Sequence, residues 1–217
     1  MERKEQQIKS EHRVATFGEV LTARREVEAM LDLVKNEAER IDSRFLEPAC
    51  GTGNFLTAIL ERKLKTLRAR YRTKRADFEV QLLSAIGSIY GIDLLEDNVR
   101  ESRERLFDLA VQGYKDSIHK APDETFQQII RLILSKNILQ GDSLNGIDQI
   151  VFTQWTLVGY RFIREEYNFK SLNNNTPEPG QLFQSSLCDA QQKPVYIPQA
   201  LKRYPPVHYR KLLEGNK

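Results

Sequence analysis

Apolar residues recur along this chain with spacings that predict helices alternating with strands. Between residues 27 and 41 they fall three or four positions apart, as on one face of an amphipathic helix. Phe45 and Leu46 then indicate the end of a short buried strand. A second helical pattern follows, with apolar positions at Phe55, Leu56, Ile59, Leu60 and Leu64. The first part of the chain therefore predicts a helix, a strand and a second helix.

The strand and the second helix are joined by a tight turn that contains Gly51 and Gly53. In parallel α/β proteins, a glycine turn between a strand and a helix lets the backbone approach a ligand at the carboxyl end of the strand. The pair of glycines is a weak signal by itself, because many nucleotide-binding proteins have one and a glycine turn can also have no ligand.

Two further strands are predicted downstream, and each is followed by an acidic residue. Residues 89–93 are apolar and end in Asp93, while residues 137–144 combine a third strand with an exit turn that contains Asp142. Long helical patterns separate the strands. Right-handed crossovers between parallel strands place such loops at one edge of the sheet, so Glu47, Asp93 and Asp142 are expected to face one ligand.

The charge of Glu47 narrows the class of ligand. A dinucleotide pyrophosphate needs a helix N-terminus free of carboxylates, and position 56 is leucine where the dinucleotide fingerprint has a third glycine or alanine. Both features disfavour an NAD-type dehydrogenase. A ligand with an ammonium group would be attracted to Glu47, and S-adenosylmethionine carries such a group together with a positively charged sulfonium.

Residues 47–55, with the sequence EPACGTGNF, resemble the cofactor motif of the N6-adenine-specific DNA methyltransferases of restriction-modification systems. The resemblance implies an α/β fold with a Rossmann-like class I methyltransferase sheet. That sheet is expected to be incomplete, with an N-terminal helix and a loosely structured C-terminal tail. It also implies S-adenosylmethionine as the cofactor and DNA as the substrate, with no metal ion.

The same resemblance implies a set of cofactor contacts. The polar loop before the first helix resembles the family's N-terminal cofactor motif, although Ala23 replaces the usual proline. Thr22 could contact the ligand's carboxylate or only cap the helix. Asp93 would bind the ribose hydroxyls or cap the next helix, and Asp142 would bind the adenine amino group or only shape a turn. The expected cofactor-binding residues are Phe17, Thr22, Glu47, Pro48, Ala49, Gly51, Gly53, Asn54, Phe55, Asp93, Leu94, Asp142 and Ser143.

The resemblance stops before the catalytic loop. Residues 148–155 are expected to form a fourth strand, after which the family has Asn or Asp, two prolines and an aromatic residue that hold the target amine. This chain has Thr153, Gln154 and Trp155 instead, so Gln154 and Trp155 are weak catalytic candidates. The Pro205–Pro206 pair near the end indicates an extended docking segment or, less favourably, a displaced catalytic loop.

Three segments follow from these patterns. Residues 1–13 form a polar N-terminal segment, and residues 14–155 form the S-adenosylmethionine-binding domain. Residues 156–217 form a C-terminal docking tail, which combines a hairpin or edge strand at 162–169 with a linker at 173–180.

Composition adds little to this assignment. The 217 residues carry a net charge of only +3, so the distribution of charge matters more than its sum. Basic residues gather between positions 62 and 75, as a solvated helix face or a contact for DNA phosphates. Cys50 and Cys188 are too few for a disulfide framework. The N-terminus does not resemble a signal peptide, and no apolar run is long enough to span a membrane, so a cytoplasmic location is expected.

The sequence therefore predicts the S-adenosylmethionine-binding part of an adenine-specific DNA methyltransferase. A second protein subunit would supply the catalytic motif and the recognition of the DNA target. Two alternatives remain open, a self-contained methyltransferase with divergent chemistry and a non-catalytic cofactor-binding partner in a DNA defence system.

Overall fold

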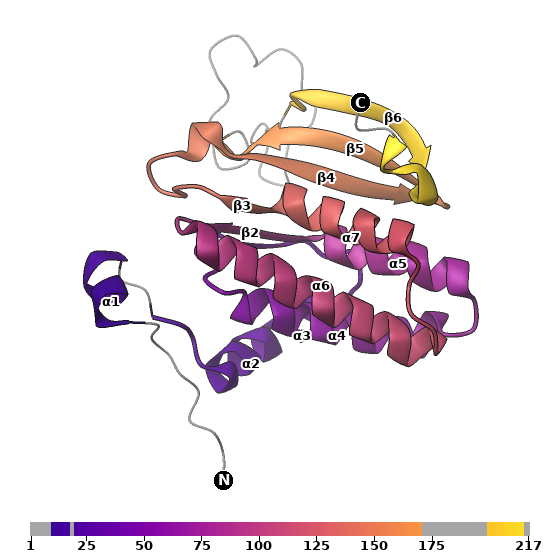
Figure 1. Ribbon diagram of the computed structural model, residues 1–217, viewed down its shortest axis with the longest axis horizontal. Coiled ribbons are helices and arrows are strands. Elements are labelled where there is room, and N and C mark those ends of the chain that lie inside the picture. The colour runs from indigo at the N-terminus through magenta and orange to yellow at the C-terminus, as the bar shows by residue number, and fades with distance from the viewer. Residues whose placement is uncertain (1–9, 18–19, 171–198, 215–217) are drawn as a thin grey trace, which may run out of the picture.

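The computed structural model describes residues 10–17, 20–170 and 199–214, and it has a mixed α/β fold (Figure 1). The helices are α1 (Glu11–Phe17), α2 (Arg24–Leu33), α3 (Lys35–Glu39), α4 (Asn54–Tyr71), α5 (Arg75–Gly87), α6 (Glu96–Ile118) and α7 (Glu124–Asn137), with 3-10 turns η1 (Ile147–Gln149) and η2 (Tyr209–Lys211). The strands are β1 (Phe45–Glu47), β2 (Ile89–Asp93), β3 (Ile138–Gln140), β4 (Val151–Val158), β5 (Arg161–Asn168) and β6 (Lys202–His208).

The first sheet is parallel and has the strand order β1-β2-β3. Phe45 pairs with Ile89, and Gly91 pairs with Ile138. The ladder continues beyond the strand ends, because the Cys50 amide donates to the carbonyl of Ile92 at 2.8 Å. The three predicted parallel strands are thereby confirmed, and their carboxyl ends lie at one edge of the sheet.

The two faces of this sheet have different coverings. Gly91 faces α4 so closely that a Cβ atom there would lie 2.8 Å from the Leu56 side chain. On the opposite face Tyr90 and Ile92 pack against the second sheet, and the Tyr90 and Phe152 rings meet edge-on at 5.3 Å. The parallel strands therefore lie between a helical layer that contains α4 and α6 and the antiparallel sheet (Figure 1).

The second sheet corrects one prediction, because residues 151–158 do not extend the parallel sheet. They form β4, which pairs antiparallel with β5 in a separate sheet of order β4-β5-β6. Phe152 of β4 packs on β2, while Trp155 packs on α5 at Gly87. The expectation came from the order of strands in the resembling family and not from a continuous apolar run, since β4 carries the polar residues Thr153, Gln154 and Thr156 between its apolar ones.

The expected C-terminal tail is partly integrated into the core. The predicted domain boundary at residue 155 falls inside β4, and Tyr209 and Leu212 are buried in the main apolar cluster. Pro205 and Pro206 lie in β6, an edge strand, where proline removes no hydrogen bond that the sheet needs. The expected linker at 173–180 and Cys188 lie outside the described residues.

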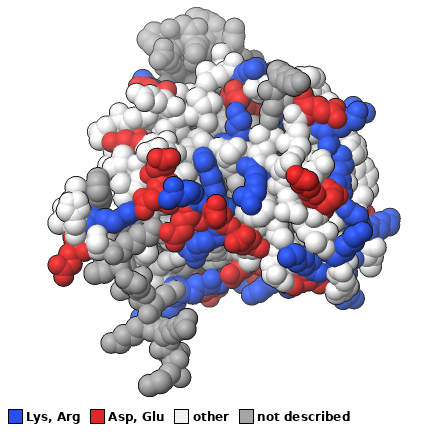
Figure 2. All heavy atoms as spheres, viewed as in Figure 1, with Lys and Arg blue, Asp and Glu red and all other residues white. Residues whose placement is uncertain are grey.

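The predicted basic run is divided between two environments. Lys63 is fully buried, and Arg62 and Arg68 form ion pairs with acidic residues of other helices. On the face seen in Figure 2, positive and negative residues are interspersed. The run also includes four exposed residues that have no ion pair within the described chain, namely Lys65, Arg70, Arg72 and Lys74.

No helix of the described chain is both long enough and apolar enough to cross a membrane.

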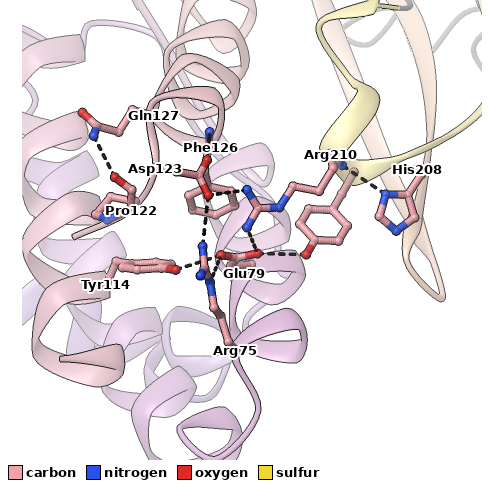
Figure 3. Close-up of polar contacts among 10 residues, drawn as sticks. Arg75, Glu79, Tyr114, Pro122, Asp123, Phe126, Gln127, His208 and Arg210 are labelled. Carbon is pink, nitrogen blue, oxygen red and sulfur yellow. Dashed lines mark hydrogen bonds and ion pairs between the residues drawn. The ribbon is translucent and has the colours of Figure 1, made fainter. Parts of the chain in front are cut away.

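A buried carboxylate fixes the C-terminal segment to the helices. Glu79 of α5 is 1% exposed and accepts hydrogen bonds from Arg75, Tyr114, Tyr209 and Arg210 at 2.5 to 2.8 Å (Figure 3). Burial is the largest influence and by itself raises the pKa of Glu79. The hydrogen bonds from Arg75, Tyr114 and Tyr209 outweigh burial, so the pKa of Glu79 lies below its ordinary value.

We expect Glu79→Gln to lower the free energy of unfolding by about 3 kcal/mol, because the guanidinium groups of Arg75 and Arg210 then share only the half-exposed carboxylate of Asp123. A lowered pKa stabilises the fold above the ordinary value of 4.5, and this stabilisation is lost as the pH falls below it. Urea titrations at several pH values between 3 and 7 measure both effects. In the variant, the free energy of unfolding should fall less steeply as the pH is lowered.

Glu39→Gln is the matched control, since Glu39 is half-exposed and lies 3.8 Å from Lys35. This substitution should lower the free energy of unfolding by less than about 0.5 kcal/mol. Equal costs for the two substitutions would contradict the structural importance of Glu79.

Candidate cofactor cleft

A cleft of about 360 Å³ opens at the carboxyl edge of the parallel sheet, and we call it the carboxyl-edge cleft. The loop before α2 and the segments that follow β1, β2 and β3 form its walls. It is lined by Val20, Leu21, Thr22, Glu47, Pro48, Ala49, Cys50, Gly51, Asn54, Phe55, Asp93, Leu94, Leu95, Asn98, Gly141, Asp142, Ser143 and Leu144. The topology thus brings the three predicted acidic residues to one place.

The glycine turn depends on backbone conformations that other residues rarely adopt. Gly51 has a φ of 52° and Gly53 a φ of 86°. Gly53 is also pressed against α6, because a Cβ atom at this position would lie 2.5 Å from the Ser102 hydroxyl. Gly53 therefore acts beneath the cleft and positions the turn, while Gly51 lines the cleft itself.

Asp93 connects the end of β2 to the glycine turn. One of its carboxylate oxygens accepts a hydrogen bond from the Gly51 amide at 2.8 Å. The other accepts from the Leu95 amide at 2.9 Å and from the Asn98 side chain at 3.1 Å. A carboxylate offers about four acceptor positions, so Asp93 holds the turn and retains capacity for one more donor.

Asp142 is similarly engaged within its own loop. Its oxygens accept from the Leu144 and Asn145 amides at 2.8 and 2.9 Å and from the Asn145 side chain at 3.0 Å. The Asn145 amide and side chain, followed by the Leu144 amide, lower the pKa of Asp142. The turn function considered from the sequence is confirmed, and contact with a base stays a prediction.

Glu47 is the least engaged of the three acids. One oxygen accepts from the Ala49 amide at 3.2 Å, and the other has no hydrogen bond within the described residues. Glu47 can therefore accept directly from a cationic group in the cleft.

Asn54 attaches the N-terminal loop to the glycine turn. Its side-chain amide donates to the Thr22 carbonyl at 3.0 Å and accepts from Arg105 at 2.8 Å. Thr22 lines the cleft but does not cap α2, because Ala23 occupies the cap position without a side-chain hydrogen bond. The expected capping role of Thr22 is therefore wrong. Phe17, at the end of α1, is not among the lining residues.

The electrostatic character of the carboxyl-edge cleft is strongly acidic. Among the described residues its lining includes Glu47, Asp93 and Asp142 but neither lysine nor arginine. Burial, followed by the charges of Asp93 and Glu47, raises the pKa of the Cys50 thiol to about 12. Cys50 is therefore a neutral thiol at physiological pH and not a nucleophile. The described residues contain no cluster of side chains suited to a metal ion.

The two weak catalytic candidates lie elsewhere. Trp155 is 7% exposed, its indole nitrogen donates to the Asn137 side chain at 3.0 Å, and its ring packs edge-on against Phe162. Gln154 donates to the Thr156 hydroxyl at 3.2 Å. Neither residue lines the carboxyl-edge cleft.

Sequence reasoning missed several lining residues, notably Leu21 and Asn98. Leu21 contacts the glycine turn, since a Cβ atom at Gly51 would lie 3.2 Å from it. Asn98 lies in the first turn of α6, and it is recognised as a cleft residue only from its hydrogen bond to Asp93.

Comparison with protein-family models, with curated proteins and with solved structures returned no match. The function of the chain must therefore be inferred from the cleft.

We expect Gly53→Ala to destabilise the protein by about 2–3 kcal/mol, since the new methyl group adds a clash with Ser102 to the cost of a positive φ. Gly159→Ala is the matched control, because Gly159 has a φ of 60° and nothing within 4 Å of its added Cβ atom. That control should lose only about 1 kcal/mol in thermal unfolding. Equal losses would show that Ser102 does not restrict the turn.

Proposed function

We propose that the carboxyl-edge cleft binds S-adenosylmethionine and that the sheet is the cofactor-binding part of a Rossmann-like methyltransferase. One observation carries this proposal: three carboxylates surround the cleft, and its described lining contains no basic side chain. A phosphate-bearing dinucleotide would be repelled there, whereas a ligand with ammonium and sulfonium charges would be attracted.

Different lining residues would contact different parts of the ligand. Glu47 would accept from the ammonium group through its free oxygen, and Thr22 would lie near the carboxylate end. Asp93 would accept from one of the ribose hydroxyls with its remaining acceptor position, and Asp142 and Ser143 would lie at the base. S-adenosylmethionine itself would supply an activated methyl group.

The proposed reaction is methylation of the N6 amine of adenine in DNA, and it requires a second polypeptide. Among the described residues, none that line the cleft corresponds to the family's Asn-Pro-Pro-Tyr loop, and Pro205–Pro206 belongs to strand β6. A partner would provide that loop and the recognition of DNA.

The self-contained alternative relies on Gln154 and Trp155. The indole of Trp155 is buried and hydrogen-bonded to Asn137, so it is not accessible for stacking on a flipped base. The non-catalytic alternative predicts the same cofactor affinity and differs only in activity with a partner.

We expect Glu47→Gln to weaken S-adenosylmethionine binding by about 10- to 100-fold, the effect of one charge-assisted hydrogen bond. Titration calorimetry measures this loss. Glu104→Gln removes an exposed carboxylate that lies outside the cleft and should leave the affinity unchanged. Stronger binding of NADH than of S-adenosylmethionine by the unmodified protein would contradict the proposal.

The partner requirement is tested with labelled cofactor and adenine-containing DNA. We expect no methyl transfer by the chain alone and transfer after addition of a subunit that carries an Asn-Pro-Pro-Tyr motif. Transfer by the chain alone would contradict the requirement for a partner. Cofactor binding without transfer in either condition would favour the non-catalytic alternative.

A further inference from the structure

A second hollow lies at the opposite edge of the parallel sheet, and we call it the amino-edge cavity. Its volume is about 430 Å³, within the range of small-molecule sites. The segment before β1, the end of α4, helix α5 and strand β4 surround it. Its lining residues are Arg40, Ile41, Asp42, Arg44, Arg70, Tyr71, Gln81, Ser84, Gly87, Ser88, Trp155, Thr156 and Leu157.

The two hollows are well separated. Asn54 of α4 lines the carboxyl-edge cleft, and Arg70 of the same helix lines the amino-edge cavity. With a rise of 1.5 Å per residue, these positions are about 24 Å apart along the helix. A ligand in one hollow therefore does not contact the other.

The charge of the amino-edge cavity is opposite to that of the cleft. Three arginines line it, and its one acidic residue, Asp42, is already paired with Arg40 at 3.2 Å. Arg44 and Arg70 are exposed and have no ion pair or hydrogen bond within the described residues. Two guanidinium groups from different segments therefore face this cavity with their donors unused.

Polar groups behind the wall of the cavity are occupied by hydrogen bonds from one buried side chain. The Lys63 amino group donates to the carbonyls of Ile41 and Ser43 at 2.9 and 2.6 Å and to the Ser88 hydroxyl at 2.5 Å. Burial lowers the pKa of Lys63 to about 7. Lys63 thus binds oxygens behind the wall, while the charged groups that line the cavity itself are the three arginines and Asp42.

We propose that the amino-edge cavity binds a phosphate-bearing ligand, held by Arg44 and Arg70. The planar guanidinium group presents paired donors that match phosphate oxygens, and two of them can share a diphosphate. The Tyr71 and Thr156 hydroxyls and the Gln81 amide are further polar groups in the lining. The phosphate can belong to a nucleotide or to a nucleic-acid backbone. This site does not depend on the proposed cofactor function.

The test uses the full chain with inorganic pyrophosphate and, separately, with a short DNA duplex. Binding is measured by phosphorus NMR for pyrophosphate and by fluorescence anisotropy for DNA, at low salt. We expect the double variant Arg44→Gln/Arg70→Gln to lose at least about tenfold in affinity for the ligand that binds. Both side chains are exposed and unpaired, so the variant should melt at the same temperature as the unmodified protein.

The matched control is Lys65→Gln/Arg72→Gln, which removes the same net charge from exposed side chains without an ion pair in the described chain, in the same region but outside the cavity. It should change the affinity less than twofold. Pyrophosphate binding indicates a nucleotide-like ligand, and binding of DNA alone indicates a backbone contact. The proposal is overturned if neither probe binds, or if the two double variants lose affinity equally. Because S-adenosylmethionine affinity is measured separately, failure here leaves the cofactor proposal intact.

Discussion

The hydrogen bond from the Gly51 amide to Asp93 is the interaction on which the carboxyl-edge cleft depends. It connects the turn after β1 to the end of β2, and the same carboxylate reaches the start of α6 through Leu95 and Asn98. The glycine turn and the junction between β2 and α6, which are distant in sequence, are thereby held together at one edge of the sheet. Because Asp93 holds the turn, part of the cleft's negative charge has a structural role. The same charge would attract a cationic ligand.

The charges at the two ends of the parallel sheet are segregated. The carboxyl-edge cleft has acidic residues without basic ones in its described lining, whereas the amino-edge cavity has three arginines. Helix α4 runs between them, and its N-terminal residues line one hollow while its C-terminal residues line the other. A net charge near zero for the whole chain conceals this separation, and the two hollows should select ligands of opposite charge.

The antiparallel sheet has a structural role that the resemblance did not suggest. It covers the face of the parallel sheet opposite to α4, through Tyr90, Phe152 and Phe169. Its last strand leads to Tyr209 and Arg210, which donate to the buried Glu79 of α5. The C-terminal segment is thus attached to the helices by a charged network, and residues 199–214 complete the core of the described chain.

The sequence alone determined the three parallel strands and the acids at their ends, because apolar runs and glycine turns are local signals. Right-handed crossovers between parallel strands then place the loops at one edge of the sheet. It also located most of the cleft lining, from Thr22 to Ser143. Only the tertiary structure decided that β4 leaves the parallel sheet and that Trp155 and Lys63 are buried. It also decided that Asp142 binds its own loop. These outcomes depend on which strands and side chains lie nearby in space. A lysine, a tryptophan or an aspartate has the same letter in the sequence whether it is buried, exposed or hydrogen-bonded.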